Sequence, residues 1–180
     1  MRSLVASVVL MVLLPACAHT PMPMAASLPV TPAAATVNAE SSKKYYRVDE
    51  IEGIGPVYQA KLKEVGITST SNLLTALATR KQRTDVAEKT GISDKRLLSW
   101  ANKADLMRLG GIGPQMSDLL EAIGVNTVPQ LAQRADVDAL HERMVFANNI
   151  SKKFVGAVPP AERVMGWIEA ARKADRVLEY

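Results

Sequence analysis

The chain has very little of the residues from which metal sites, disulfides and most active sites are made. Its 180 residues include one cysteine, Cys17, and two histidines, His19 and His141. One cysteine cannot form a disulfide within the chain, and the two histidines lack metal-ligand spacing. No serine or cysteine stands in a recognisable nucleophile motif. We therefore expect no enzyme, no cofactor, no metal and no small-molecule substrate.

Strand patterning and strong charge of one sign are also missing. No alternation of apolar and polar residues persists anywhere, so we expect an all-α protein. The formal net charge is +4, with 18 acidic residues interspersed among 22 basic ones. Such a mixture produces no strong positive field, so composition favours nucleic acid or an anionic surface only slightly. With 48% hydrophobic residues the chain can bury one modest core.

What the chain does contain is an internal repeat. The sequence Glu-Gly-Ile-Gly-Pro at 52–56 returns as Gly-Gly-Ile-Gly-Pro at 110–114, an offset of 111 − 53 = 58. The glycines permit positive φ and close backbone approach, and proline suits the first position of a helix. The same offset pairs Ile51 with Leu109, Leu62 with Leu120, Gly66 with Gly124, Ile67 with Val125, and Leu73 with Leu131.

These residues carry a family resemblance. Gly-Ile-Gly-Pro followed by Leu62 and Gly66, or by Leu120 and Gly124, resembles the helix-hairpin-helix motif. The segment from about Tyr46 to Ala174 is similar to a family of unknown function built on two such motifs, and Asp105-Leu106-Met107-Arg108 is a further likeness. The resemblance implies a compact all-α domain at 43–180, with repeats at about 46–78 and 104–136.

Local signals predict where the helices begin and end. Ser69 and Thr127 fall at equivalent positions as N-caps, and Gln130 has the spacing to bond back to the cap N–H. Gly66, Gly124 and Gly91 are expected to end helices, and Asp105 to cap a short turn at 106–109. Helices are expected at 56–65, at 81–90, after Ser93, at 139–150 and from 161 to about 178, and 152–160 is expected to be a loop. In the first of these helices Val57, Leu62 and Val65 should point inward. In the last, Val164, Trp167, Ile168 and Ala171 should share one face.

The N-terminus reads as a secretory signal at 1–16. A short positive start is followed by an apolar run from Leu4 to Leu14, which is too short to span a bilayer. Leu-Pro-Ala-Cys at 14–17 resembles the bacterial lipobox, which implies lipidation of Cys17 and attachment to a membrane of the bacterial cell envelope. Cleavage after Ala18 instead fits a soluble secreted or periplasmic product. Residues 17–42, rich in Pro, Ala and Thr, are expected to form a disordered tether.

Nucleic acid is one predicted partner. In helix-hairpin-helix proteins backbone N–H groups and a helix N-terminus hold a phosphate, and glycine allows close approach. The resemblance implies such contacts at Gly53, Ile54, Gly55, Gly111, Ile112 and Gly113. In this interpretation Arg108, Lys61 and a basic-aromatic cluster at 43–47 help, and the alternative for the cluster is an N-terminal flank whose tyrosines cover the edge of the core. The run Arg80-Lys81-Gln82-Arg83 is either a further basic patch or a solvated helix start.

An unknown protein is the alternative partner. Asp49, Glu50 and Glu52 precede the first hairpin and oppose a phosphate there, while Arg108 favours the second hairpin and Asp118 opposes it. In this alternative Ile54 and Ile112 fill the core and both hairpins are compact helix corners. The working surface is then an exposed apolar or mixed-charge face elsewhere.

Overall fold

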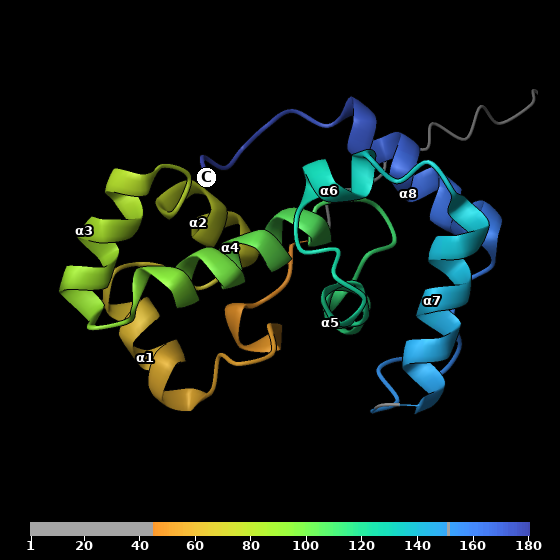
Figure 1. Cartoon of the computed structure of the whole chain (residues 1–180). Coiled ribbons are helices and arrows are strands. Elements are labelled where there is room, and N and C mark those ends of the chain that lie inside the picture. Colours follow the sequence, from red (N-terminus) through yellow and green to blue (C-terminus); the bar gives the residue numbers. More distant parts are fainter. Residues whose placement is uncertain (1–44, 151) are drawn as a thin grey trace, which may run out of the picture. The chain divides into compact units, whose positions relative to one another are not determined.

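Eight α-helices and one short 3₁₀ helix form the regular structure of residues 45–150 and 152–180, the part of the chain described by the computed structural model (Figure 1). Within these residues the protein is all α, as predicted; an isolated antiparallel bridge joins Arg47 and Ser69. The predicted signal, tether and Cys17, together with Lys43 and Lys44, lie outside the described residues. The elements are η1 Val48–Glu50, α1 Pro56–Glu64, α2 Thr70–Ala76, α3 Arg80–Thr90, α4 Asp94–Met107, α5 Pro114–Ala122, α6 Val128–Ala132, α7 Val137–Ile150 and α8 Ala161–Lys173.

The predicted helix ends are largely confirmed. Ser69 and Thr127 are N-caps whose hydroxyls accept from the N–H groups of Asn72 and Gln130. Gly66, Gly91 and Gly124 adopt positive φ angles of 79°, 66° and 81° at helix ends. One detail of the second cap differs, because the Gln130 side chain accepts from the N–H of Asn126 and not from that of Thr127.

Three local predictions are wrong. Asp105 caps no turn, because α4 continues through it to Met107. The last helix ends at Lys173, five residues early, and the remaining chain runs extended so that Leu178 reaches another part of the core. Val57 points outward with 69% of its surface exposed, since its position on α1 lies opposite the buried Leu62.

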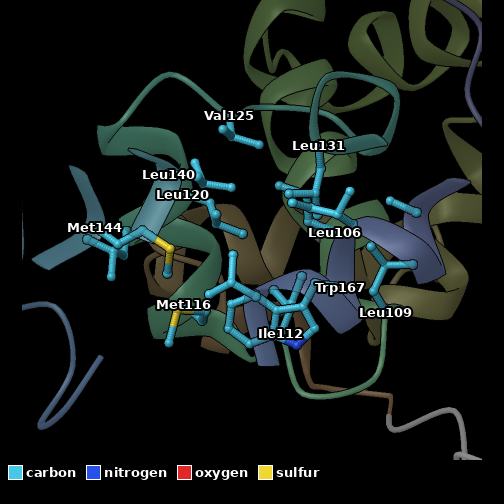
Figure 2. Packing of buried hydrophobic residues seen from close by; sticks show 14 of the residues in the cluster. Leu106, Leu109, Ile112, Met116, Leu120, Val125, Leu131, Leu140, Met144 and Trp167 are labelled. Carbon is cyan, nitrogen blue, oxygen red and sulfur yellow. The ribbon is translucent and has the colours of Figure 1, made fainter. Parts of the chain in front are cut away.

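The core consists of two hydrophobic clusters that divide the helices into two quartets. The first cluster lies among η1 and α1–α4, and the second lies among α5–α8 with the end of α4. Helix α4 serves both, because Met107 packs into the first cluster and Leu106 into the second, and in Figure 1 it leads from α2 and α3 toward α5 and α6. Figure 2 shows the second cluster, in which Leu106 and Leu109 meet side chains from α5, α7 and α8.

The structural repeat is longer than the sequence repeat. In each quartet a nine-residue helix that begins with proline is followed by a short helix and two longer ones. Trp100 on α4 and Trp167 on α8 occupy matching places, but their offset is 167 − 100 = 67, larger than the 58 of the glycines. The extra residues lie in α7 and between the end of α7 and the start of α8, so they move the second tryptophan out of the sequence register.

One buried asparagine on α7 holds residues 154 and 155, which follow this helix, against it. The Asn148 side chain accepts from the N–H groups of Phe154 and Val155 and donates to the carbonyl of Val155. These bonds satisfy backbone groups that the loop would otherwise bury without partners. Val155 is thereby placed in the second cluster.

Candidate functional site

The two glycine turns, Glu52–Pro56 and Gly110–Pro114, have the same local geometry. Gly53 and Gly111 adopt φ angles of +93° and +90°, which side chains rarely tolerate. Ile54 and Ile112 are buried, as the second interpretation predicted. The turns differ from each other only in what surrounds them.

A tryptophan explains the glycine that stands before the isoleucine of each turn, Gly53 in the first and Gly111 in the second. A Cβ at Gly53 would lie 3.2 Å from Nε1 of Trp100, and one at Gly111 would lie 3.0 Å from Nε1 of Trp167. Trp167 belongs to the second cluster, where Figure 2 shows its indole among the buried side chains. Packing and backbone conformation therefore both favour glycine at these two positions, whatever the turns bind.

The backbone N–H groups predicted to hold phosphates are only partly available. Ile54 N donates to the carbonyl of Ile51, and Ile112 N donates to that of Leu109, both at 3.1 Å. The turns use these two donors themselves. The second glycine of each turn, Gly55 or Gly113, is the extended N-cap of the following helix.

The surroundings of the second glycine separate the two turns. A Cβ at Gly55 would meet nothing within 4 Å, and a hollow of about 500 Å³ lies over residues 49–58. A Cβ at Gly113 would meet the hydroxyl of Tyr46 at 3.3 Å. Glu50 also lines the hollow of about 460 Å³ at the start of α5. The first turn is thus the more open one.

The carboxylates before the first turn all have partners. Arg47 binds Asp49 at 2.9 Å, and this hydrogen bond lowers the pKa of Asp49. The backbone N–H of Arg47 donates to Glu50. Lys152 binds Glu52 at 2.6 Å, and hydrogen bonds from Lys152 and from Asp118 lower the pKa of Glu52.

An ion-pair network joins the two quartets beside these turns. Lys103 of α4 is almost buried and lies 2.6 Å from Asp118 and 2.9 Å from Glu121, both on α5. Burial lowers the pKa of Lys103, but the hydrogen bonds to the two carboxylates outweigh it and raise the pKa overall. Burial raises the pKa of Asp118, although Lys103 opposes this. Asp118 therefore fixes α5 against α4.

The two cations predicted to assist phosphate binding have other bonds. Lys61 donates to the carbonyl of Thr90 at 2.9 Å, which ties α1 to the end of α3. Arg108 donates from Nε to Asp105 and from Nη2 to the carbonyl of Asp175 at 2.6 Å. Only 19% of the Arg108 side chain is exposed. The structure brings neither cation into a common patch with a glycine turn.

Two further arginines have roles that the sequence did not reveal. Arg83, which the sequence placed in a basic patch or solvated helix start, is buried and donates to the carbonyls of Leu77 and Ala78. Arg96 lies 4.8 Å over the ring of Tyr58, whose edge meets Trp100 at 5.3 Å between ring centroids. No periodic signal marks such contacts, because the partners are 38 and 42 residues apart in sequence.

Exposed apolar side chains form the remaining feature. Phe146 and Ile150 stand one turn apart on α7, and each exposes 63% of its surface; we call them the α7 apolar pair. Lys152 and Lys153 follow closely in the chain, and both are exposed. Val57 in the first quartet is similarly exposed but stands alone on its helix.

The arrangement defines an all-α domain of two helical quartets, each with a glycine turn closed over a tryptophan. The chain belongs to the family described as domain of unknown function DUF4332, whose match covers residues 52–174. No curated protein and no solved structure shows significant similarity to the chain. Within residues 45–150 and 152–180 no group of acidic, histidine or cysteine side chains has the geometry of a metal site. None of the helices seen there has both the length and the apolar character needed to cross a membrane.

Proposed function

We propose that this chain is a non-catalytic protein-interaction module, held at the bacterial cell envelope through a lipid on Cys17, in which two helix-hairpin-helix turns serve the fold. The contact of Gly53 with Trp100, repeated by Gly111 with Trp167, carries this proposal. It accounts for the most unusual residues of the repeat by packing alone. The internal bonds of Lys61 and Arg108 add support, because they direct both cations to backbone carbonyls outside the two glycine turns.

The α7 apolar pair is the proposed contact surface. Two large apolar side chains exposed one turn apart offer the spacing with which helices are recognised at protein interfaces. Lys153 is exposed nearby and forms no ion pair among the described residues. The matching partner surface is apolar at its centre and carries carboxylates at its rim.

Site-specific photocrosslinking in the native envelope tests this proposal. A photoreactive phenylalanine at position 146 is expected to give a discrete adduct that protease destroys and nuclease leaves intact. The same residue at position 57 is the matched control, because Val57 is equally exposed but lies in the other quartet. The captured protein, once purified, should lose at least about tenfold in affinity for the variant Ile150→Asp.

Three results would overturn the proposal. Position 146 would give no adduct, or positions 57 and 146 would capture the same set of proteins, or the adduct at 146 would be sensitive to nuclease. Crosslinking at position 57 measures nonspecific proximity in the same molecule, so no other protein is needed as a control.

Binding of a nucleic-acid backbone is the second candidate, and the first turn favours it. Gly55 has open space where a side chain would stand, and it precedes a nine-residue helix whose start faces a hollow. This candidate predicts binding to a short duplex or single strand that weakens steeply with salt. Gly55→Ala should abolish that binding, and Gly156→Ala, at another open glycine, should leave it unchanged.

A further inference from the structure

A cavity of about 390 Å³ lies where the ends of α4 and α8 meet α6 and the C-terminal segment. Its volume falls within the range of small-molecule sites. Val128, Pro129, Ala132 and Ala171 supply an apolar wall. Tyr180 lines another side of the cavity.

Three arginines, Arg108, Arg172 and Arg176, line the same cavity. Arg172 donates from Nε to the carbonyl of Ala132 and from Nη2 to that of Arg134, so its guanidinium is held in place. Arg108 is held in the same manner by Asp105 and by the carbonyl of Asp175. In both side chains Nη1 has no acceptor among the described residues, which leaves donors that are fixed in direction.

The carboxylates at the cavity do not neutralise these cations fully. Two aspartates line the cavity: Asp105 is 3% exposed and is engaged by Arg108, and Asp175 is exposed and forms no ion pair among the described residues. Among the described residues neither Arg172 nor Arg176 lies within ion-pair distance of a carboxylate. Arg176 instead lies 5.4 Å from the centre of the Tyr180 ring. The cavity thus combines an apolar wall with two guanidinium groups free of acidic partners.

We propose that this cavity binds a small organic anion, with its carboxylate or phosphate on Arg108, Arg172 and Arg176 and its apolar body against α6 and α8. Guanidinium groups prefer such oxyanions because their N–H groups match two oxygens at once. The apolar wall selects against inorganic anions, which have nothing to bury there. The site shares no residue with the α7 apolar pair, so its test is independent of the test of the proposed function.

Titration of the full chain with 4-phenylbutanoate, followed by the Nε–Hε NMR signals of the arginines, tests the site. We expect saturable shifts at Arg108 and Arg172, much weaker binding of the neutral 4-phenylbutanamide, and no comparable binding of acetate. Phenyl phosphate serves as the second probe and distinguishes phosphate from carboxylate preference.

Matched variants locate the site. Arg176→Gln removes a guanidinium that lies near the Tyr180 ring and forms no ion pair among the described residues, and it should weaken phenylbutanoate binding about tenfold. Arg163→Gln removes an exposed arginine from the start of α8 and should change nothing. The proposal is overturned if neither probe binds at about 10 mM, if the amide binds as well as the acid, or if Arg176→Gln and Arg163→Gln behave alike.

Discussion

The two glycine turns share the sequence Gly-Ile-Gly-Pro and a similar backbone, but they have different neighbours. In the first, Gly55 is open and the nearby carboxylates are paired with Arg47 and Lys152. In the second, Tyr46 stands over Gly113, and Glu50 lines the hollow at the start of α5. The flanking charges in the sequence favoured the second turn for an anion, whereas the structure leaves the first more accessible. A repeated motif therefore preserves a fold without preserving a site.

The tryptophans give the largest test of how alike the two quartets are. Trp100→Ala and Trp167→Ala each remove a buried indole beneath a glycine turn, and each should lower the free energy of unfolding by about 3–5 kcal/mol. Because α4 contributes to both clusters, we expect one cooperative urea transition in both variants.

Tyr45→Ala is the control for those variants, since Tyr45 is exposed, and it should change stability by less than about 0.5 kcal/mol. Two separate transitions in either tryptophan variant, seen by circular dichroism and fluorescence, would show instead that the quartets unfold independently.

The glycines sharpen the comparison within each turn. Gly111→Ala should cost about 2–3 kcal/mol and Gly53→Ala about 1–2 kcal/mol, because both need positive φ and the former approaches its indole more closely. Gly55→Ala should cost less than about 1 kcal/mol, since φ there is ordinary and the space is open. Urea unfolding measures all three, and a Gly55→Ala cost equal to that of Gly53→Ala would contradict this account.

The helix caps should be equal in the two quartets. Ser69→Ala and Thr127→Ala each remove one hydroxyl that accepts from a backbone N–H, and each should cost about 1 kcal/mol in thermal or urea unfolding. Ser93→Ala is the matched control, because Ser93 is an N-cap without such a bond and its loss should cost less. Equal effects at all three sites would argue against the bonds as the cause.

Two aspartates should respond to pH in opposite directions. Burial raises the pKa of Asp105 despite its pair with Arg108, so wild type should lose stability relative to Asp105→Asn as pH rises from 3.8 through the raised pKa. Arg47 lowers the pKa of Asp49, so wild type should lose stability relative to Asp49→Asn as pH falls from 3.8 through the lowered pKa. Urea unfolding across pH checks both slopes, and slopes of the same sign would refute the assignment; the Asp49 effect is the smaller because that side chain is exposed.

Local chemistry made the helix boundaries predictable. Proline at the first position of α1, the hydroxyl of Ser69 and the left-handed Gly91 each act within four residues of themselves. The wrong predictions arose where packing in the folded protein, and not the local sequence, determines the structure. Asp105 stays helical in a stretch of α4 whose neighbours Leu106 and Met107 are buried in the two clusters, and Val57 is exposed because it lies on the side of α1 away from Leu62.

The candidate sites were less predictable for the same reason. Trp100 and Trp167 lie 47 and 56 residues beyond the glycines that they touch, as 100 − 53 and 167 − 111 give. Tyr46 reaches the second turn from the start of the domain. Arg172 lies before the end of α8 and Arg176 lies after it, and both line one cavity. The sequence did not predict that the helix ends between them.

Leu178 sets the order in which the protein becomes complete during its synthesis. This residue fills the first cluster although it lies 71 residues beyond the end of α4, as 178 − 107 gives, and the N–H of Glu179 donates to the carbonyl of Ala78. During synthesis, helices α1–α4 are therefore made well before Leu178, the residue that completes their hydrophobic cluster. Until residue 178 has been made, the first cluster therefore lacks one of its fully buried side chains, and the apolar surface that Leu178 covers stays open to solvent.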